Sequence, residues 1–388
     1  MKLQESSLIG TGTLSGVASR YPEKTSRLGS VFADVTNSYK LVWFLAILSL
    51  LKQGAGNDLA MTDVLNEMVV VAWYPVSMFR LSLGRMDKLQ HSILAIQQET
   101  GLAANASPHE IRGFLAHSPV ASASLDYLRR FVPTRFLAPW FAGELFGIKD
   151  WLKDARICEL AAESQRSDSE RSDSPSPYFL DHDAGTTKIV FDRSWRAFLL
   201  ENLGVIGSFA EHSFAQYLQA RNPNVPGVLN KLRPPSMRQL MLAHEFWRRV
   251  QSSLALHGRT TEFCDIYSGR QIDGRFAVDH FLPWSFVAHD LLWNLIPVEQ
   301  TTNSSKSDVL PDLDYYLPRL VRVQMGAIRC MQDHPKMLED YTDCFKQDVA
   351  GLVSMREEEL TTRYREIMLP QVQMAQNMGF QSGWIMRR

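Results

Sequence analysis

The stretch 263–311 constrains the fold of this chain more than any other, because two short apolar runs alternate in it with turn-forming and polar residues. Residues 264–282 contain two turn pairs with Gly and end in a strand-like apolar run, which predicts a small hairpin. Residues 283–292 predict an irregular loop with one helical turn. Residues 294–298 are apolar but too short to be stable alone, so we expect them to pack beside the hairpin.

A short polar helix is predicted after these runs. Thr301 and Thr302 are possible N-caps for a helix that carries Asn303 and Lys306. Because these last two residues are three positions apart, they would share one helix face. The stretch therefore predicts two strands, a loop and a helix around one pocket.

An Asp-His pair at the end of the first apolar run points to phosphodiester hydrolysis. His280 is of the side-chain type best suited to take a proton from an attacking water near neutral pH. Asp279 and Asn303 offer one carboxylate and one amide oxygen, which suffice for a Mg²⁺ ion that keeps several water ligands. Because side chains alternate along a strand, His280 should point away from Asp279, so a bulge or the strand end must bring both to the phosphate.

This pattern resembles the HNH, or ββα-metal, nuclease family. It resembles most the HNH domain of the RNA-guided CRISPR type II effectors and the bacterial defence-type HNH proteins that share its spacing. The matching signature is Asp-His-Phe-Leu-Pro-x-Ser-Phe over residues 279–286, then Asn294, then Asn-x-x-Lys-Ser-Asp over residues 303–308, then Pro311. The last family position is Asn303 instead of the more frequent His, which makes this an H-N-N variant.

The resemblance implies a role for each matching residue. His280 would be the general base, and Asp279 and Asn303 would hold one Mg²⁺ or Mn²⁺ ion. Asn294, which completes the catalytic set with His280, would bond across the loop and fix the strand that carries the His. Lys306 would face the phosphate backbone or brace the helix.

Two further side-chain types near this site, His and Cys, are common metal ligands. His289 in the loop is a possible accessory residue for the metal or substrate, although a structural role is favoured. Many relatives in the family carry a Cys-x-x-Cys on the hairpin that helps to hold structural zinc. Cys264 has no second Cys nearby and the others, Cys158, Cys330 and Cys344, are scattered singly, so we expect no structural zinc and a hairpin held by packing.

Local charge gives a second hint of a nucleic-acid partner. Residues 221–275 hold nine basic and four acidic side chains, whereas the whole chain has a formal net charge of −1. A basic approach surface for DNA that includes Arg270 and Arg275 is one interpretation. Ordinary helix-surface charge is the other, and the sequence does not separate the two.

The pattern outside this stretch predicts a mainly α protein with a small embedded α+β (ββα-metal) HNH nuclease module. The predicted regions are an N-terminal helical domain (1–162), a polar low-complexity linker or loop (163–177), a helical region with a short hairpin (178–256), the HNH nuclease module (257–312) and a C-terminal helical region (313–388). The hairpin of the third region would pair residues 178–180 with residues 188–191.

Cysteine usage and apolar runs favour a cytoplasmic protein. The four cysteines are scattered and no signal peptide is recognised. The longest apolar run, residues 41–51, has about half the length of a membrane-spanning helix, so no membrane partner is expected. No Walker or dinucleotide-binding motif is found, so no motor activity is encoded.

The sequence therefore predicts a metal-dependent DNA endonuclease that nicks one strand at a time. An RNA nuclease with the same site is one alternative. A nucleic-acid-binding or partner-binding module activated by another protein is the other. The resemblance further implies a restriction or anti-phage effector that works beside a separately encoded sensor or motor protein. Whether the protein is a monomeric nickase or a dimer stays open.

Overall fold

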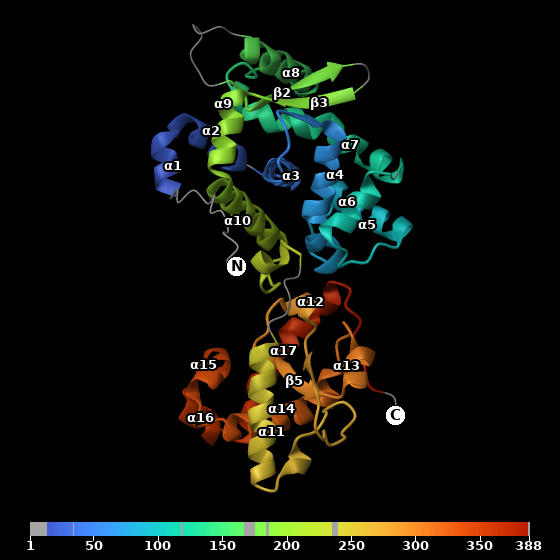
Figure 1. The fold of residues 1–388 in the computed structure, drawn as a ribbon, viewed down its shortest axis with the longest axis vertical. Coiled ribbons are helices and arrows are strands. Elements are labelled where there is room, and N and C mark those ends of the chain that lie inside the picture. Colours follow the sequence, from blue (N-terminus) through green and yellow to red (C-terminus); the bar gives the residue numbers. More distant parts are fainter. Residues whose placement is uncertain are drawn as a thin grey trace, which may run out of the picture. The chain divides into compact units, whose positions relative to one another are not determined.

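The computed structural model describes residues 14–33, 35–117, 119–166, 175–183, 186–234 and 240–386. The chain divides into two units, each with its own core (Figure 1). The N-terminal unit comprises Met1–Pro223 with Lys231–Pro234, and the C-terminal unit comprises Asn224–Asn230 with Pro235–Arg388. The predicted architecture, mainly α with small antiparallel sheets, is confirmed.

The N-terminal unit is built around helix α3 (Tyr39–Lys52), which is apolar on all sides and largely buried. Helices α4 (Met61–Trp73) and α10 (Leu203–Arg221) pack against it. Within the described ranges, no helix combines the length and apolarity that crossing a membrane requires. The other helices of this unit are α1 (Leu14–Arg20), α2 (Pro22–Ala33), η1 (Tyr74–Met78), α5 (Lys88–Thr100), α6 (Pro108–Leu115), α7 (Pro119–Leu137), η2 (Ala138–Phe141), α8 (Asp150–Arg166) and α9 (Arg193–Glu201).

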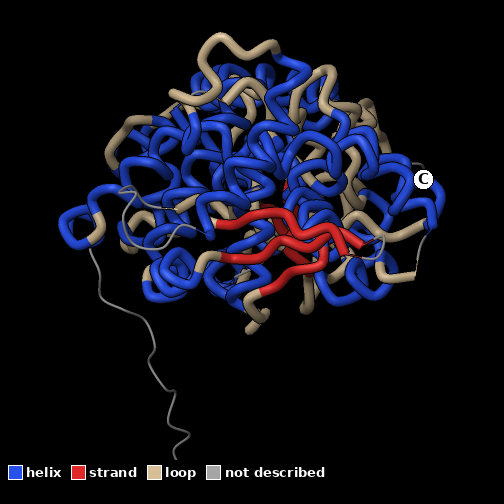
Figure 2. The backbone as a smooth tube through the Cα atoms, turned by 90° about the horizontal axis from the view of Figure 1, so that it is seen from above, coloured by secondary structure: helices blue, strands red, loops and turns tan. Residues whose placement is uncertain are grey.

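A three-stranded antiparallel sheet joins distant parts of the N-terminal unit (Figure 2). Its strands are β1 (Asp58–Ala60), β2 (Tyr178–Asp183) and β3 (Thr186–Phe191), in the order β1-β3-β2. The predicted hairpin is confirmed, since Leu180 pairs with Ile189. Ile189 also pairs with Leu59 of β1, so the strands at 178–191 belong to the same unit as the first helices.

This pairing corrects the predicted division of the chain. Residues 163–177 do not separate two units, because the sheet and α10 on their far side complete the core of α3 and α4. Helix α8 continues to Arg166, and residues 167–174 lie outside the described ranges. A polar low-complexity stretch predicts exposure, and an exposed excursion within one unit has the same sequence signature as a linker between two.

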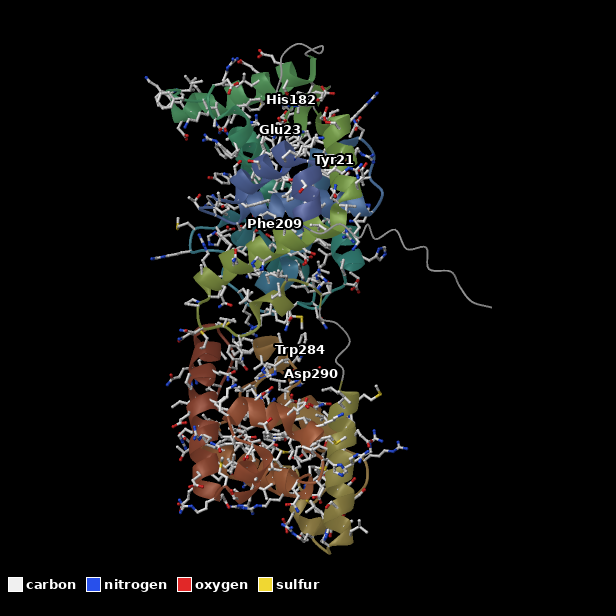
Figure 3. All side chains as sticks on the ribbon, turned by 90° about the vertical axis from the view of Figure 1, so that its left-hand side faces the viewer. Tyr21, Glu23, His182, Phe209, Trp284 and Asp290 are labelled. Carbon is white, nitrogen blue, oxygen red and sulfur yellow. The ribbon has the colours of Figure 1, made fainter. Side chains whose placement is uncertain are left out.

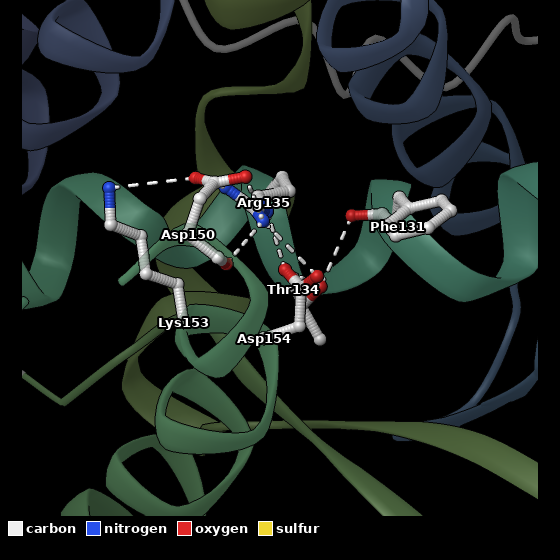
Figure 4. A network of polar contacts seen from close by, with 6 residues as sticks. All are labelled: Phe131, Thr134, Arg135, Asp150, Lys153 and Asp154. Carbon is white, nitrogen blue, oxygen red and sulfur yellow. Dashed lines mark hydrogen bonds and ion pairs between the residues drawn. The ribbon is translucent and has the colours of Figure 1, made fainter. Parts of the chain in front are cut away.

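Helix α7 continues through Pro133, although Pro removes a helical N–H donor. The carbonyl of Pro133 accepts a hydrogen bond from the hydroxyl of Tyr178 at 2.7 Å. Two residues later, the guanidinium of Arg135 joins α7 to the carboxylates of Asp150 and Asp154 on α8 (Figure 4). These tertiary contacts outweigh the local cost of the Pro.

The C-terminal unit surrounds a two-stranded sheet with helices. One hydrophobic core runs through it and includes Trp247, Leu295 and Tyr364, all fully buried. The predicted boundary at residue 178 therefore does not mark the start of this unit. The predicted boundaries at residues 257 and 313 do not divide its core. Its elements are α11 (Met241–Leu256), η4 (Thr260–Glu262), β4 (Ala277–His280), α12 (Trp284–Val287), η5 (Leu292–Asn294), β5 (Leu295–Val298), α13 (Gln300–Lys306), α14 (Leu313–Cys330), η6 (Pro335–Leu338), α15 (Glu339–Phe345), α16 (Val349–Ser354) and α17 (Glu357–Asn377). A further short helix, η3 (Val228–Lys231), is shared between the units. Its first three residues belong to the C-terminal unit, and Lys231 belongs to the N-terminal unit.

Candidate active site

The Asp-His pair lies on β4, which pairs with β5 in antiparallel register. Asp279 lies opposite Ile296, and His280 lies opposite Leu295. The predicted hairpin over 264–282 is present only in its first part. Cys264 forms an antiparallel bridge with Gln271, and the amides of Asp265 and Ile272 donate to the carbonyls of Arg270 and Phe263, each at 2.9 Å, whereas residues 277–280 pair with β5 instead. The physical reason is burial: every residue of β4 and β5 is buried, so the two short runs gain most by pairing with each other.

The carboxylate of Asp279 is 5% exposed and has two side-chain partners. The hydroxyl of Tyr267 donates to Oδ2 at 2.9 Å, and the ammonium of Lys306 lies 3.3 Å from Oδ1 and 3.2 Å from Oδ2. Burial and the Asp279 carboxylate raise the pKa of Tyr267 well above its usual range, so the phenol stays protonated and can donate. These contacts offset the desolvation of Asp279 and fix its orientation.

The imidazole of His280 is buried and faces a different partner. Its Nε2 lies 2.8 Å from Oδ1 of Asp290. Asp290, which is labelled in Figure 3, belongs to the loop between α12 and η5. The backbone carbonyl of His280 accepts a hydrogen bond from the ammonium of Lys306 at 2.7 Å. Thus the side chains of Asp279 and His280 have separate partners, which agrees with the alternation expected along a strand.

Asn294 forms the predicted bond across the loop. Its Oδ1 accepts from the amide of Leu282 at 2.8 Å, and its Nδ2 donates to the carbonyl of Leu282 at 3.0 Å. Its own carbonyl accepts from the amide of Phe281 at 2.9 Å. Because Asn294 is fully buried, these bonds hold the end of β4 directly after His280.

Helix α13 brings the third part of the site against β4. It begins at Gln300, with Glu299 as its N-cap residue, so the predicted caps at Thr301 and Thr302 are wrong. The helix starts earlier because the amide of Glu299 already has a tertiary acceptor, the carboxylate of Asp265 at 3.0 Å. That contact lies outside the helix and leaves no trace in the local sequence.

The two residues on this helix have different surroundings. Lys306 is fully buried and ties α13 to both Asp279 and His280. Its position corresponds to the bracing role, and its burial does not support the predicted direct contact with a phosphate backbone. Asn303, one turn earlier, is half-buried. Its side-chain amide group makes no hydrogen bond within the described part of the chain.

The remaining predicted residues lie outside this network of contacts. The ring of His289 packs against Trp293 at 5.4 Å, and its Nδ1 lies 3.4 Å from the amide of Leu291, which favours the structural role. Arg270 and Arg275 are exposed, and Arg270 lies 4.0 Å from the carboxylate of Glu299. Their exposure is compatible with a nucleic-acid contact and with ordinary surface charge.

Sequence reasoning missed two residues that contact the site. Tyr267 was assigned to the hairpin and Asp290 to an irregular loop, with no role for either. Asp290 lies beside His289, the His that was considered, yet the carboxylate is the group that meets His280. No spacing rule in the sequence pairs a loop residue with an imidazole ten positions earlier.

The residues present fit one divalent cation with oxygen ligands. The described residues contain no group of three or more His, Cys, Asp or Glu side chains that could hold a metal ion. Asp279 and Asn303 would therefore supply few ligands and water the rest, which Mg²⁺ commonly accepts. A carboxylate has lone pairs beyond the contacts that Tyr267 and Lys306 make, so Asp279 keeps the capacity to bind a cation.

Comparison with known families identifies this part of the chain. Residues 265–312 match a family model described as HNH endonuclease. On the ground of this similarity, residues 265–312 are called the HNH module below. The HNH module covers a small part of the chain, and the match supports no narrower group within the family, so it does not show the resemblance to CRISPR type II effectors. Comparisons with curated proteins and with solved structures gave no match.

The presence of an HNH module supports nuclease activity and a nucleic-acid substrate. HNH nucleases generally use a divalent metal, and this agrees with the oxygen donors of Asp279 and Asn303. The module also gives a common purpose to the buried contacts described above. They hold the carboxylate of Asp279, the imidazole of His280 and the helix that carries Asn303 together at β4.

Proposed function

We propose that this protein is a metal-dependent endonuclease that hydrolyses DNA phosphodiester bonds and nicks one strand at a time. The observation that carries the proposal is the position of Lys306. Its single ammonium contacts the carboxylate of Asp279 and the carbonyl of His280, so it holds the helix that bears Asn303 against the Asp-His pair. The chemical groups that the reaction needs therefore come from two elements that are fixed to each other.

Each residue has a defined task in this proposal. His280 takes the proton of the attacking water through its ring nitrogen Nδ1, since Nε2 is engaged with Asp290. Asp279 and Asn303 would hold the divalent cation. When bound, that ion supplies stabilisation of the negative charge that develops on the phosphate and on the leaving 3′ oxygen. Asn294 keeps the end of the strand in place through the loop.

The proposal has three further parts: nicking of one strand, contact with the phosphate backbone and a biological role. A single HNH site has one set of reacting groups, so a monomer would nick, and a double-strand break would need a dimer or two successive nicks. Exposed Arg270 and Arg275 would approach the phosphate backbone. A cytoplasmic anti-phage or restriction effector that works with a separate sensor or motor protein is an inference from the resemblance to bacterial HNH proteins alone.

A supercoiled-plasmid assay tests the proposal. Wild type and His280→Ala are incubated with Mg²⁺, with Mn²⁺ or with EDTA, and a structured RNA is tested in parallel. We expect open-circle DNA that needs both the metal and His280. The matched control is His257→Ala, because His257 is exposed directly after the end of α11 and its ring nitrogen Nδ1 lies 2.7 Å from the carbonyl oxygen of nearby Ser253.

Each other outcome has a definite meaning. Cleavage of RNA alone would replace DNA as the substrate and keep the site. Wild-type cleavage by a folded His280→Ala protein would overturn the assignment of the base. A folded wild type that cuts neither substrate would favour a binding module or a nuclease that needs its partner.

A further inference from the structure

We infer that Asp290 is a positioning residue for His280, which fixes the imidazole as the tautomer with hydrogen on Nε2 and leaves Nδ1 to accept the proton of the attacking water. The inference rests on the proposed nuclease function and adds to it a residue outside the Asp-His-Asn set. Asp290 would act only through His280 and would not itself touch the reacting atoms.

The geometry of the contact dictates which nitrogen carries the hydrogen. Nε2 of His280 lies 2.8 Å from Oδ1 of Asp290, within normal hydrogen-bonding distance. An ionised carboxylate can only accept a hydrogen bond, so Nε2 must donate. A neutral imidazole has a single N–H, and the lone pair therefore lies on Nδ1.

Burial makes this choice of tautomer effective. The side chain of His280 is 4% exposed and that of Asp290 is 22% exposed. Because Nε2 is in contact with Asp290 and both side chains are largely buried, water cannot readily compete for Nε2, and a hydrogen bond to an ionised group is stronger when it is shielded in this way. The ring is thus held in one orientation before substrate arrives.

The loop that carries Asp290 is held on both sides by contacts that do not involve His280. Before it, the carbonyl of Ala288 accepts from Nδ2 of Asn230 at 3.4 Å. After it, the amide of Leu292 donates to Oδ2 of Asp340 at 2.9 Å, and the hydroxyl of Tyr341 lies 3.3 Å from the carbonyl of Leu292. The carboxylate of Asp290 is therefore placed by the fold, and its removal should leave the loop standing.

Backbone strain at the start of the loop supports a positioned carboxylate. Ala288 has a φ of +55°, in the left-handed region that side chains other than Gly seldom adopt, and it ends helix α12. Such strain persists where the surrounding structure over-determines the backbone, and it is concentrated at functional sites. The strained turn sends the chain directly toward Asp290.

The test compares three variants of the full chain. Asp290→Asn keeps the shape of the side chain but can offer an N–H to Nε2, which favours the opposite tautomer. Asp290→Glu keeps the carboxylate. Asp340→Asn is the matched control, because its carboxylate holds the same loop at Leu292 but is not a partner of His280.

Two readouts are measured at a pH where the imidazole is neutral. In nitrogen-15 histidine NMR spectra, with the signal assigned by its loss in His280→Ala, wild type should show hydrogen on Nε2 and Asp290→Asn should show hydrogen on Nδ1. In plasmid nicking, Asp290→Asn should lose about 10²-fold or more in kcat with KM little changed. Asp290→Glu should recover part of that loss, and Asp340→Asn should nick at close to the wild-type rate.

The outcomes separate this inference from the proposed function. Hydrogen on Nδ1 in wild type, or a wild-type kcat in Asp290→Asn, would overturn it. An equal loss in Asp290→Asn and Asp340→Asn, with equal falls in thermal midpoint, would show a structural role only and overturn it as well. If wild type cuts nothing, the protein alone is not an active nuclease and a binding module or a partner-dependent nuclease is favoured, while the tautomer change still decides whether Asp290 positions His280.

Discussion

The two units bury a carboxylate in different chemical settings. In the N-terminal unit Glu67 is 2% exposed, and Arg112 binds it through two nitrogens, each at 2.7 Å. The hydroxyl of Ser49 and the amide of Gln53 donate to the same carboxylate at 2.6 and 3.3 Å. Every partner of Glu67 is a donor that stabilises the helices, and none is a group that could take a proton from a water molecule.

Asp279 in the C-terminal unit is buried to a similar degree, at 5% exposure, but has different neighbours. It is followed by His280 in the chain, and the helix that supplies its cation partner Lys306 also carries Asn303. The comparison teaches that burial of a charge does not by itself mark a functional site. The chemical type of the neighbours is more informative, since metal-dependent hydrolysis needs a metal ligand, a second ligand and a base close together.

The largest expected difference in nicking rate is between two variants that each remove one buried carboxylate, Asp279→Ala and Glu67→Gln. Asp279→Ala should lower the rate of plasmid nicking by about 10²–10³-fold or more, because a metal ligand is lost where charge develops in the reaction. Isothermal titration with Mg²⁺ should show weaker binding. Glu67→Gln should nick at the wild-type rate at a temperature where the protein is folded. Equal losses of activity in the two variants would show that the two buried carboxylates do not differ in function.

A smaller effect is expected when the cation of each pair is removed. Lys306→Met leaves Asp279 buried without its cation, and we expect a loss of about 3–5 kcal/mol in the free energy of unfolding. Arg112→Met should cost less, about 2 kcal/mol, because the Arg112 side chain is 36% exposed and Glu67 keeps Ser49 and Gln53. Differential scanning calorimetry would measure both. A larger loss in Arg112→Met would contradict this order.

The smallest expected effect concerns a buried lysine of the N-terminal unit. Burial lowers the pKa of Lys231 to about 7, so the folded protein binds a proton there less readily than the unfolded chain does. Stability should therefore rise as pH increases from 6 to 9, by about 2 kcal/mol from this residue. Lys231→Met should flatten that rise in thermal midpoint between the two pH values. An unchanged slope in the variant would assign the pH dependence to other groups.

The candidate site residues could be predicted from the sequence because they form short patterns of fixed spacing. Asp279 and His280 are adjacent, Asn294 follows at a fixed spacing, and Asn303 and Lys306 lie on one short helix. The helical turn after Pro283 and the bond of Asn294 across the loop were also expected and are present. Most of these features depend on residues that are close neighbours in the sequence, and the bond of Asn294 to Leu282 spans 12 positions within one loop.

The sequence by itself determined the mainly helical class, the β2–β3 hairpin and the residues of the HNH module. Only the tertiary structure decided that β4 pairs with β5, that β1 joins residues 178–191 to the first helices, and that Asp290 and Tyr267 contact the Asp279-His280 pair. Strand partners and side-chain contacts depend on which distant surfaces become buried together. That choice is made by the free energy of the whole core, and no local pattern records it.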